Sequence, residues 1–251
     1  MKFSVITICY NAEATLEKTI QSVRAQDYPD MEYIIIDGNS TDATLSIIKK
    51  HSPHITHMIS EKDKGIFDAM NKGVTLATGD VLYFLNADDQ LFDLNVLSRI
   101  ASQFTDHPDS DIIYGDAVPI NHPAKTPAYF MDPFRGDIQT PLDALKKGMC
   151  QQRLFIRKNA FNKIGLFNLN YKIAGDIDWF IRAVYHPLIL NHLKIPVTYY
   201  NCTGESRKRR KELILNKLES ALRTAPLQDT FKFLIFSLVK RIRSNTDHSE
   251  S

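Results

Sequence analysis

Segments typical of strands and of helices alternate along the first 115 residues, and this alternation most strongly constrains the fold. Short apolar runs predict buried strands at 3–10, 32–36, 55–59, 81–85 and 111–115. Between them, apolar residues recur at spacings of three and four, which predicts helices around Leu16 to Val23 and near 42–50, 66–77 and 93–104. This order predicts an α/β fold with a mainly parallel central sheet flanked by helices.

Polar residues follow three of the predicted strands directly. Tyr10 and Asn11 follow the first strand, Asp37 follows the second, and 86–89 follow the fourth. Ligands of such sheets bind outside the carboxyl ends of the strands, so these residues are expected at one edge. Asn11 is also placed to cap the next helix. Asp37 is placed to accept hydrogen bonds from a ribose or base, or to serve as a turn residue before the following helix.

The fourth strand ends in an acidic pair. Val81 to Leu85 are all apolar, and Asn86, Ala87, Asp88 and Asp89 come next. Two adjacent carboxylates repel each other unless a positive charge lies between them. Asp88 and Asp89, with Asn86 nearby, offer the oxygen ligands that Mg²⁺ or Mn²⁺ prefers. The alternative interpretation is a polar turn after a core strand.

The familiar phosphate-binding loops are absent from the sequence. No Gly-x-Gly-x-x-Gly follows the first strand, where 9–14 read Cys-Tyr-Asn-Ala-Glu-Ala, and no Gly-Lys-Ser/Thr loop occurs. The sequence therefore argues against a dehydrogenase or a P-loop nucleotidase. A bound diphosphate would need another source of positive charge, and a cation held at Asp88 and Asp89 would supply it.

The second half of the chain is less regular. One acidic residue there, Asp176, directly follows Gly175 at the start of a predicted helix. It is interpreted either as a helix N-cap or as a general base pointing into the cleft. The other expected elements are proline-rich loops or an edge hairpin at 119–141, a strand at 151–156, a helix at 158–164 and one or two strands at 188–200.

The last residues form a basic tail. Residues 206–251 hold eleven Lys or Arg and five Asp or Glu, a net charge of +6 in a chain whose total is only +2. A basic cluster at 207–211 precedes two predicted helices, at 211–224 and 229–243. The second helix is amphipathic, which is typical either of a helix lying on an anionic membrane or of one packed on the body. Its apolar face comprises Phe231, Leu234, Ile235, Leu238, Val239 and Ile242.

Composition limits the class of protein. With 251 residues and 43% hydrophobic content, the chain is expected to form a soluble globular protein with a proper core. It shows no secretory signal and no run long enough to span a membrane. Its cysteines, Cys9, Cys150 and Cys202, match neither a disulfide framework nor a zinc site. A cytoplasmic location is therefore expected, with the tail allowing peripheral contact with the inner face of a membrane.

Several ordered motifs resemble the family 2 glycosyltransferases. In the first half these motifs are 5–11, 36–44, 60–73 and 85–89, and in the second half 151–155, 164–167 and 174–179 resemble the acceptor half of bacterial polysaccharide members. The resemblance covers about 3–200 and implies a GT-A-like fold with C-terminal helices, an inverting reaction and a nucleotide-diphosphate sugar donor. It implies a nucleotide-sugar-binding half at 1–115, an acceptor-binding half of the same domain at 116–205, and a tail at 206–251.

The resemblance also implies roles for single residues. Tyr10, Asn11 and Asp37 would hold the base and ribose, Asp63, Gly65 and Asn71 would line the donor pocket, Asp88 and Asp89 would bind the metal, and Asp176 would be the catalytic base. Two positions depart from the family pattern. Asn86 stands where Asp is common, which weakens an expected ribose contact. Gln151 stands where His is often found, so no role is assigned to it.

The leading hypothesis is therefore a metal-dependent inverting transferase that adds a sugar to a lipid-linked saccharide during synthesis of a surface polysaccharide. In this mechanism Asp176 takes the proton of an acceptor hydroxyl, and the oxygen displaces the diphosphate in one step. The first alternative is a non-catalytic module that binds sugar nucleotides. The second, nucleic-acid binding through 207–211, is disfavoured because that cluster lacks interleaved aromatic residues and any recognition motif.

Overall fold

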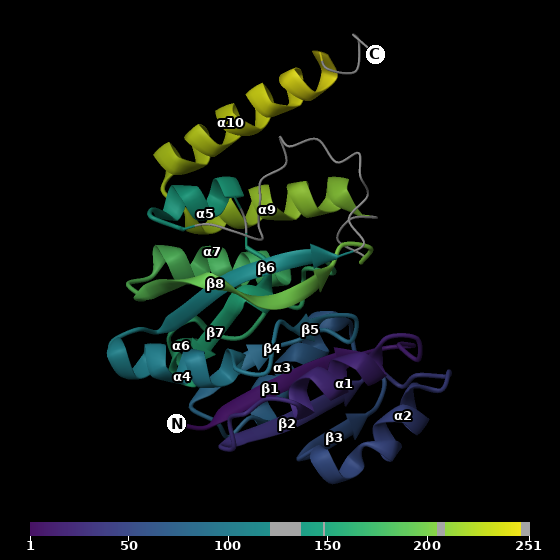
Figure 1. The fold of residues 1–251 in the computed structure, drawn as a ribbon. Helices are drawn as coiled ribbons and strands as arrows, with labels where there is room; N and C mark the ends of the chain where they lie inside the picture. The colour runs from purple at the N-terminus through teal and green to yellow at the C-terminus, as the bar shows by residue number, and fades with distance from the viewer. Residues whose placement is uncertain (121–136, 148, 205–208, 247–251) are drawn as a thin grey trace.

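One mixed sheet of eight strands runs through the protein. The computed structural model describes residues 1–120, 137–147, 149–204 and 209–246 (Figure 1). The strand order across the sheet is β3-β2-β1-β4-β7-β6-β8-β5. The strands are β1 (Phe3–Cys9), β2 (Met31–Asp37), β3 (His57–Ser60), β4 (Val81–Phe84), β5 (Gln90–Leu91), β6 (Ile112–Ile120), β7 (Leu154–Arg157) and β8 (Leu190–Asn201).

The strand directions confirm the predicted mainly parallel sheet and add two reversals. Strands β1 to β4 pair in parallel, with Phe3 opposite Met31 and Cys9 opposite Asp37 in the β1–β2 register. Strand β7 lies antiparallel between β4 and β6, and β5 pairs antiparallel with β8. A strand of two residues such as β5 carries no periodicity, so the sequence did not predict it.

Helices flank the sheet and extend beyond it, as predicted. Two expectations change: the strand expected from Gln151 begins only at Leu154 after a 3₁₀ turn (Gln151–Arg153), and α5 was not predicted. The helices are α1 (Leu16–Arg24), α2 (Thr44–Lys50), α3 (Ile66–Leu76), α4 (Val96–Asp106), α5 (Pro141–Lys147), α6 (Lys158–Ile164), α7 (Gly175–Tyr185), α9 (Arg210–Thr224) and α10 (Leu227–Thr246), with a 3₁₀ turn at Ser52–His54.

Each face of the sheet supports its own core, because side chains alternate along a strand. Along β1, Val5 packs with α1, α2 and α4, whereas Ile6 packs with α3, α6 and α7. The core around Ile6 is rich in aromatic rings, among them Phe67 of α3 and Trp179 of α7. Helices α3 and α7, which carry predicted site residues, therefore pack on the same face of the sheet.

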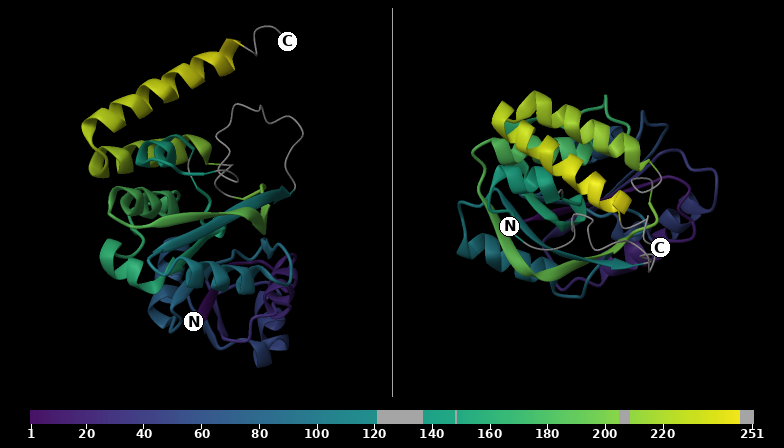
Figure 2. Two further views of the ribbon diagram at one scale, coloured as in Figure 1. Left: turned by 60° about the vertical axis from the view of Figure 1, so that its left-hand side comes forward. Right: turned by 90° about the horizontal axis from the view of Figure 1, so that it is seen from above.

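The C-terminal helices add further layers beyond α7. A smaller cluster joins Leu145 of α5, Ile181 of α7, Ala221 of α9 and Phe233 of α10. Figure 1 shows α7, then α5 with α9, and then α10 stacked outward from the sheet, and Figure 2 shows α10 as the outermost layer. Among the residues that the structure describes, no helix is long and apolar enough to cross a membrane.

The structure corrects one predicted cap and shortens one predicted loop. Asn11 does not cap α1, because that helix begins five residues later and its N-cap, Thr15, makes no side-chain cap bond. The expected loops at 119–141 are shorter at both ends, since β6 extends to Ile120 and α5 begins at Pro141. Residues 121–136, with 207 and 208 of the basic cluster, lie outside the described residues.

Candidate active site

The loops after β1 and β2 form the first part of the site. Asn11 has a left-handed backbone with φ of 49°, and its Oδ1 accepts a hydrogen bond of 2.9 Å from the Thr41 amide. Its own amide donates to Ser40 Oγ at 2.8 Å. These bonds tie the two loops together. Tyr10, next to Asn11, is 64% exposed, so its ring is open to a planar ligand.

Asp37 lies beneath these loops rather than at their surface. It is fully buried, and its carboxylate accepts hydrogen bonds from the Ser40 hydroxyl and amide and from the Ser60 hydroxyl. Through these bonds Asp37 is placed to hold the loop after β2. The direct ribose or base contact expected from the sequence stays a prediction.

Asp63 brings the loop before α3 to the same mouth. Its Oδ1 accepts a hydrogen bond of 2.8 Å from the Gly65 amide. A Cβ added at Gly38 would lie 2.8 Å from Asp63 Oδ2 and 3.4 Å from the ring of Tyr10. Gly38 therefore lets these side chains approach each other. The structure thus brings Tyr10, Asn11, Asp63 and Gly65 together at the carboxyl edge of β1 and β2.

The acidic turn after β4 places its two carboxylates differently. Asp89 is 1% exposed, and its carboxylate accepts hydrogen bonds of 2.7 Å from both Gln152 Nε2 and the Asn201 amide. Asp88 is only partly buried. Burial raises the pKa of Asp88, and burial together with the charge of Asp88 raises the pKa of Asp89. A cation beside Asp88 would relieve this cost of burying two like charges.

The acidic turn fits a metal ion that shares its ligands with a substrate. No group of three or more His, Cys, Asp or Glu side chains suited to a metal occurs among the described residues. Mg²⁺ and related ions often bind through one or two carboxylates plus the phosphates of a substrate. Asp88 suits that arrangement, whereas both oxygens of Asp89 already accept hydrogen bonds from the protein.

Asp176 approaches the site from the first turn of α7. Ala174, just before the helix, has a left-handed φ of 69°, a strained conformation of the kind found at functional sites. A Cβ at Gly175 would lie 2.7 Å from the ring of Phe67, so glycine allows α7 to pack closely on α3. The Asp176 carboxylate accepts hydrogen bonds from the backbone at Ile177 and Asp176, and burial raises its pKa to about 6.

A small cavity joins Asp176 to the acidic turn. It has a volume of about 100 Å³, and both Asp176 and Asn86 line it. Gln151 also lines it and donates a hydrogen bond of 3.1 Å from Nε2 to Asn86 Oδ1. The remaining lining residues are Ile66, Phe67, Cys150, Gln152, Lys172, Ile173, Ala174 and Tyr200.

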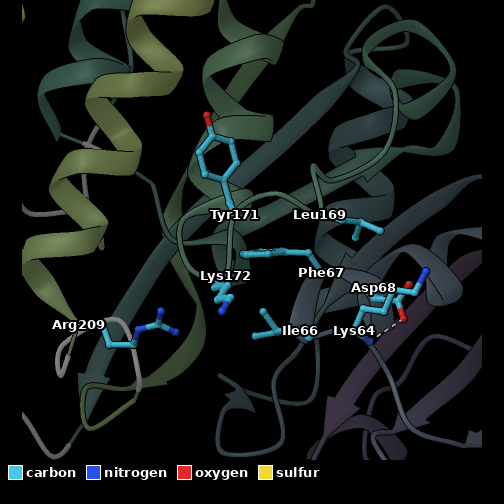
Figure 3. Close-up of a pocket in the computed structure, with 9 residues that line it drawn as sticks. Lys64, Ile66, Phe67, Asp68, Leu169, Tyr171, Lys172 and Arg209 are labelled. Carbon is cyan, nitrogen blue, oxygen red and sulfur yellow. Dashed lines mark hydrogen bonds between the residues drawn. The ribbon is translucent and has the colours of Figure 1, made fainter.

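A second cavity of about 240 Å³ adjoins the first and shares Ile66, Phe67 and Lys172 with it. Figure 3 shows Phe67 at its centre, with Lys172 and Arg209 on one side and Lys64 on the other. Arg209 is paired with Glu212, whereas the ammonium groups of Lys64 and Lys172 have no partner among the described residues. This cavity therefore offers positive charge beside the candidate catalytic residue.

Not every predicted residue reaches these cavities. Asn71 instead exchanges two hydrogen bonds of 2.9 Å with the backbone of Phe167, which joins α3 to the segment before α7. The sequence also left Gln152, Lys172 and Tyr200 unassigned. All three come from the less regular second half. Gln152 lies in the motif at 151–155, whereas no motif in the sequence marks Lys172 or Tyr200.

The fold is that of a GT-A glycosyltransferase. The chain belongs to glycosyl transferase family 2, whose family profile matches 4–165, and this confirms the resemblance predicted from the motifs. A PGL/p-HBAD biosynthesis glycosyltransferase of Mycobacterium bovis is 35% identical over 208 residues, which are 80% of this chain and 77% of the relative. An uncharacterized glycosyltransferase of Mycobacterium tuberculosis is 32% identical over 184 residues, which are 72% of this chain and 68% of the relative.

Solved structures share the fold at low sequence identity. TarS 1–349 of Staphylococcus aureus in complex with UDP-GlcNAc has a TM-score of 0.72 at 21% identity, over 93% of this chain and 72% of that chain. The mannosyltransferase PcManGT of Pyrobaculum calidifontis, in complex with GDP-Man and Mn²⁺, has a TM-score of 0.70 at 17% identity, over 95% and 69%. Against a longer TarS chain, the alignment spans only 42% of that chain.

Proposed function

We propose that this glycosyltransferase is an inverting, metal-dependent enzyme that moves a hexose from a nucleotide-diphosphate donor to a hydroxyl of a lipid-linked saccharide. The observation that carries the proposal is the cavity shared by Asp176 and Asn86 of the acidic turn. It sets a carboxyl whose pKa is raised to about 6 beside the turn that would face the diphosphate. A base of this pKa is well matched to neutral conditions.

The nucleotide would bind at the mouth formed by Tyr10, Asn11 and Asp63. The exposed ring of Tyr10 offers a stacking surface for a base. Asn11 and Asp63 offer an amide group and a carboxylate for the base or ribose. Asp37, through its bonds to Ser40 and Ser60, would keep the loop after β2 in place.

Asp88 would hold the divalent cation, Mn²⁺ or Mg²⁺, and Asp89 would fix the conformation of the turn. When bound, such an ion neutralises the charge that develops on a leaving diphosphate. The bonds of Asp89 to Gln152 and to the Asn201 amide favour a positioning role for it. Lys172, which lines both cavities, adds positive charge close to the same region.

Asp176 would take the proton from the attacking acceptor hydroxyl. The oxygen would bond to the anomeric carbon as the bond from that carbon to the diphosphate breaks, so one displacement inverts the configuration. The apolar side chains of Ile66 and Phe67 line the cavity and would limit the access of competing water. Gln151 would orient Asn86 beside the reacting sugar.

The relatives support the choice of substrates to test. Two structural neighbours are complexes with UDP-GlcNAc and with GDP-Man, and the M. bovis relative is named for PGL/p-HBAD biosynthesis. We therefore expect a nucleotide-diphosphate hexose or N-acetylhexosamine as donor. The lipid-linked acceptor rests on the basic tail of the chain, with its net charge of +6.

Release of nucleoside diphosphate from a panel of sugar nucleotides, with Mn²⁺ or with a chelator, tests this proposal. We expect one donor to be turned over, and we expect the chelator and Asp88→Asn each to lower the rate at least about 100-fold. Asp109→Asn is the matched control. Asp109 follows α4 in the sequence and is exposed, and its side chain makes no hydrogen bond or ion pair with the described residues.

Other outcomes would contradict parts of the proposal. Full activity of Asp88→Asn with chelator present would remove the metal role. A retained anomeric configuration in the product, measured by NMR, would exclude the single displacement. Tight nucleotide binding by calorimetry without turnover of any donor would instead indicate a non-catalytic sugar-nucleotide-binding module.

A further inference from the structure

A row of exposed apolar side chains runs along the outward face of α10. Leu227, Phe231, Leu234, Ile235 and Leu238 form this outward row, and they are between 39% and 81% exposed. Their spacings of three and four place all five on one side of the helix. Single exposed leucines are common on protein surfaces, whereas a contiguous apolar row indicates an interaction surface.

The other face of α10 already holds the helix on the body. Phe233 is buried against Ala221 of α9 and its neighbours in the third core cluster. Thr230 is also buried, and its hydroxyl donates to the Ala221 carbonyl at 3.3 Å. Tyr185 of α7 donates a hydrogen bond of 3.1 Å to Asp229. Packing on the body therefore accounts for one face of this amphipathic helix and leaves the outward row unexplained.

The outward row lies on the outermost layer of the protein. The left view in Figure 2 shows α10 beyond α9 and α5, and the right view, from above, shows no described element covering it. The helix is thus held in place by its inner face while its outer face is presented to the surroundings. This arrangement suits contact with an extended surface.

The charge of the surrounding segment indicates what that surface is. Residues 206–251 carry a net charge of +6. Lys232, next to the outward row in sequence, is 57% exposed and lies 3.8 Å from Asp229. An apolar row within a cationic segment complements an anionic bilayer, because apolar groups enter the acyl boundary and cations meet the headgroups. A second copy of the chain would bring two such positive segments together, which is unfavourable.

We propose that α10 docks this protein on an anionic lipid surface through its outward row. Docking goes beyond the transfer reaction proposed above, because neither donor nor acceptor takes part in it. It also fits that reaction. Helix α7, which carries Asp176, is tied to α9 by the hydrogen bond of 2.7 Å from Ser220 to Asp178, so the docked layer is mechanically joined to the candidate site.

Cosedimentation of the full chain with lipid vesicles, without donor or acceptor, tests the docking proposal. We expect binding to phosphatidylcholine vesicles that contain phosphatidylglycerol, and weaker binding to phosphatidylcholine alone. The triple variant Phe231→Ser, Ile235→Ser, Leu238→Ser should lower the partition coefficient at least about tenfold. The matched control is Leu94→Ser with Ile189→Ser, which removes apolar side chains that are 57% and 48% exposed elsewhere, and it should bind as the unchanged protein does.

Several results would overturn the proposal. The first is that the unchanged protein does not bind anionic vesicles. The second is that the triple variant binds them as strongly as the unchanged protein does. The third is that light scattering shows a dimer, which the triple variant abolishes. If the triple variant fails to fold by circular dichroism, Phe231→Ser alone and the salt dependence of the unchanged protein decide the question. If the unchanged protein turned over its donor but did not bind anionic vesicles, docking would be refuted and the proposed reaction would stand. If it bound the vesicles but turned over no donor, the proposed reaction would fail and docking would stand.

Discussion

Asp176 and Asp178 lie in the same helical turn of α7, yet their surroundings give them opposite roles. Asp178 is buried and accepts hydrogen bonds from Ser220 and Arg182. The bond from Ser220 joins α7 to α9, and the bond from Arg182 lies within α7. Asp176 lines the cavity, and burial raises its pKa to about 6. The sequence offered a cap or a base for Asp176. Asp176 is not the N-cap, because that position is Ala174, and its role as a base stays a prediction.

Asp176→Asn should abolish most of the activity and leave nucleotide binding intact. Removing a general base costs about 10²–10⁴-fold in rate. Because the deprotonated carboxylate is the active form, kcat of the unchanged enzyme should rise with pH through about 6 and then level off. Steady-state kinetics over pH, with Asp109→Asn as the control, measures both effects. Full activity of Asp176→Asn would show that another group accepts the proton.

The same substitution should stabilise the protein at high pH. A carboxyl whose pKa is raised from 3.8 to about 6 on folding stabilises the fold while protonated, and this contribution is lost as the pH rises through that range. Asp176→Asn stays neutral, so the free energy of unfolding should increase by about 1–2 kcal/mol near pH 8 and change little near pH 4. Urea denaturation at both pH values measures the difference, and equal effects at the two pH values would contradict it.

At the scale of elements, the close approach of α3 and α7 shapes the site. Gly175 of α7 packs on Phe67 of α3, which lines both cavities, and Asn71 further along α3 binds the backbone of Phe167. The periodicity of each helix could be predicted, whereas their approach could not. It depends on a missing Cβ at one residue and on an aromatic ring more than a hundred positions away in the sequence.

Gly175→Ala should therefore disturb catalysis more than nucleotide binding. The added Cβ would lie 2.7 Å from the Phe67 ring, and such overpacking costs about 1–3 kcal/mol of stability. Displacement of α7 should lower kcat, while the nucleotide mouth at Tyr10 keeps its structure. Thermal unfolding, transfer kinetics and nucleotide calorimetry measure the three quantities.

The matched control for this change is Gly204→Ala, since a Cβ at Gly204 meets nothing within 4 Å. Phe67→Leu combined with Gly175→Ala should recover part of the lost stability, because the smaller side chain makes room. If Gly175→Ala matched the control in all three measurements, the packing of α7 on α3 would not matter for the reaction.

For the whole molecule, the sequence predicted the mainly parallel sheet, most helices and the order of the motifs. These predictions depend on the local periodicity of apolar residues and on the rule that ligands bind at the carboxyl ends of parallel strands. The reversed strands β5 and β7 and the burial of Asp37 were not predictable in this way. They depend on contacts between distant segments, such as the pairing of Tyr83 with Phe155.

The bond from the Asn201 amide to Asp89 has a consequence for any attempt to divide this enzyme. Every residue expected to touch the nucleotide or the cation precedes residue 90, yet Asp89 is held by Gln152 and Asn201, and the edge of β4 is covered by β7. A fragment of 1–115 should therefore expose an unpaired strand edge and bind nucleotide at least about tenfold more weakly than the full chain in calorimetry. Equal binding would refute this. The nucleotide-sugar-binding half therefore cannot be exchanged between relatives by itself, and a chimaera must include the second half of the same protein.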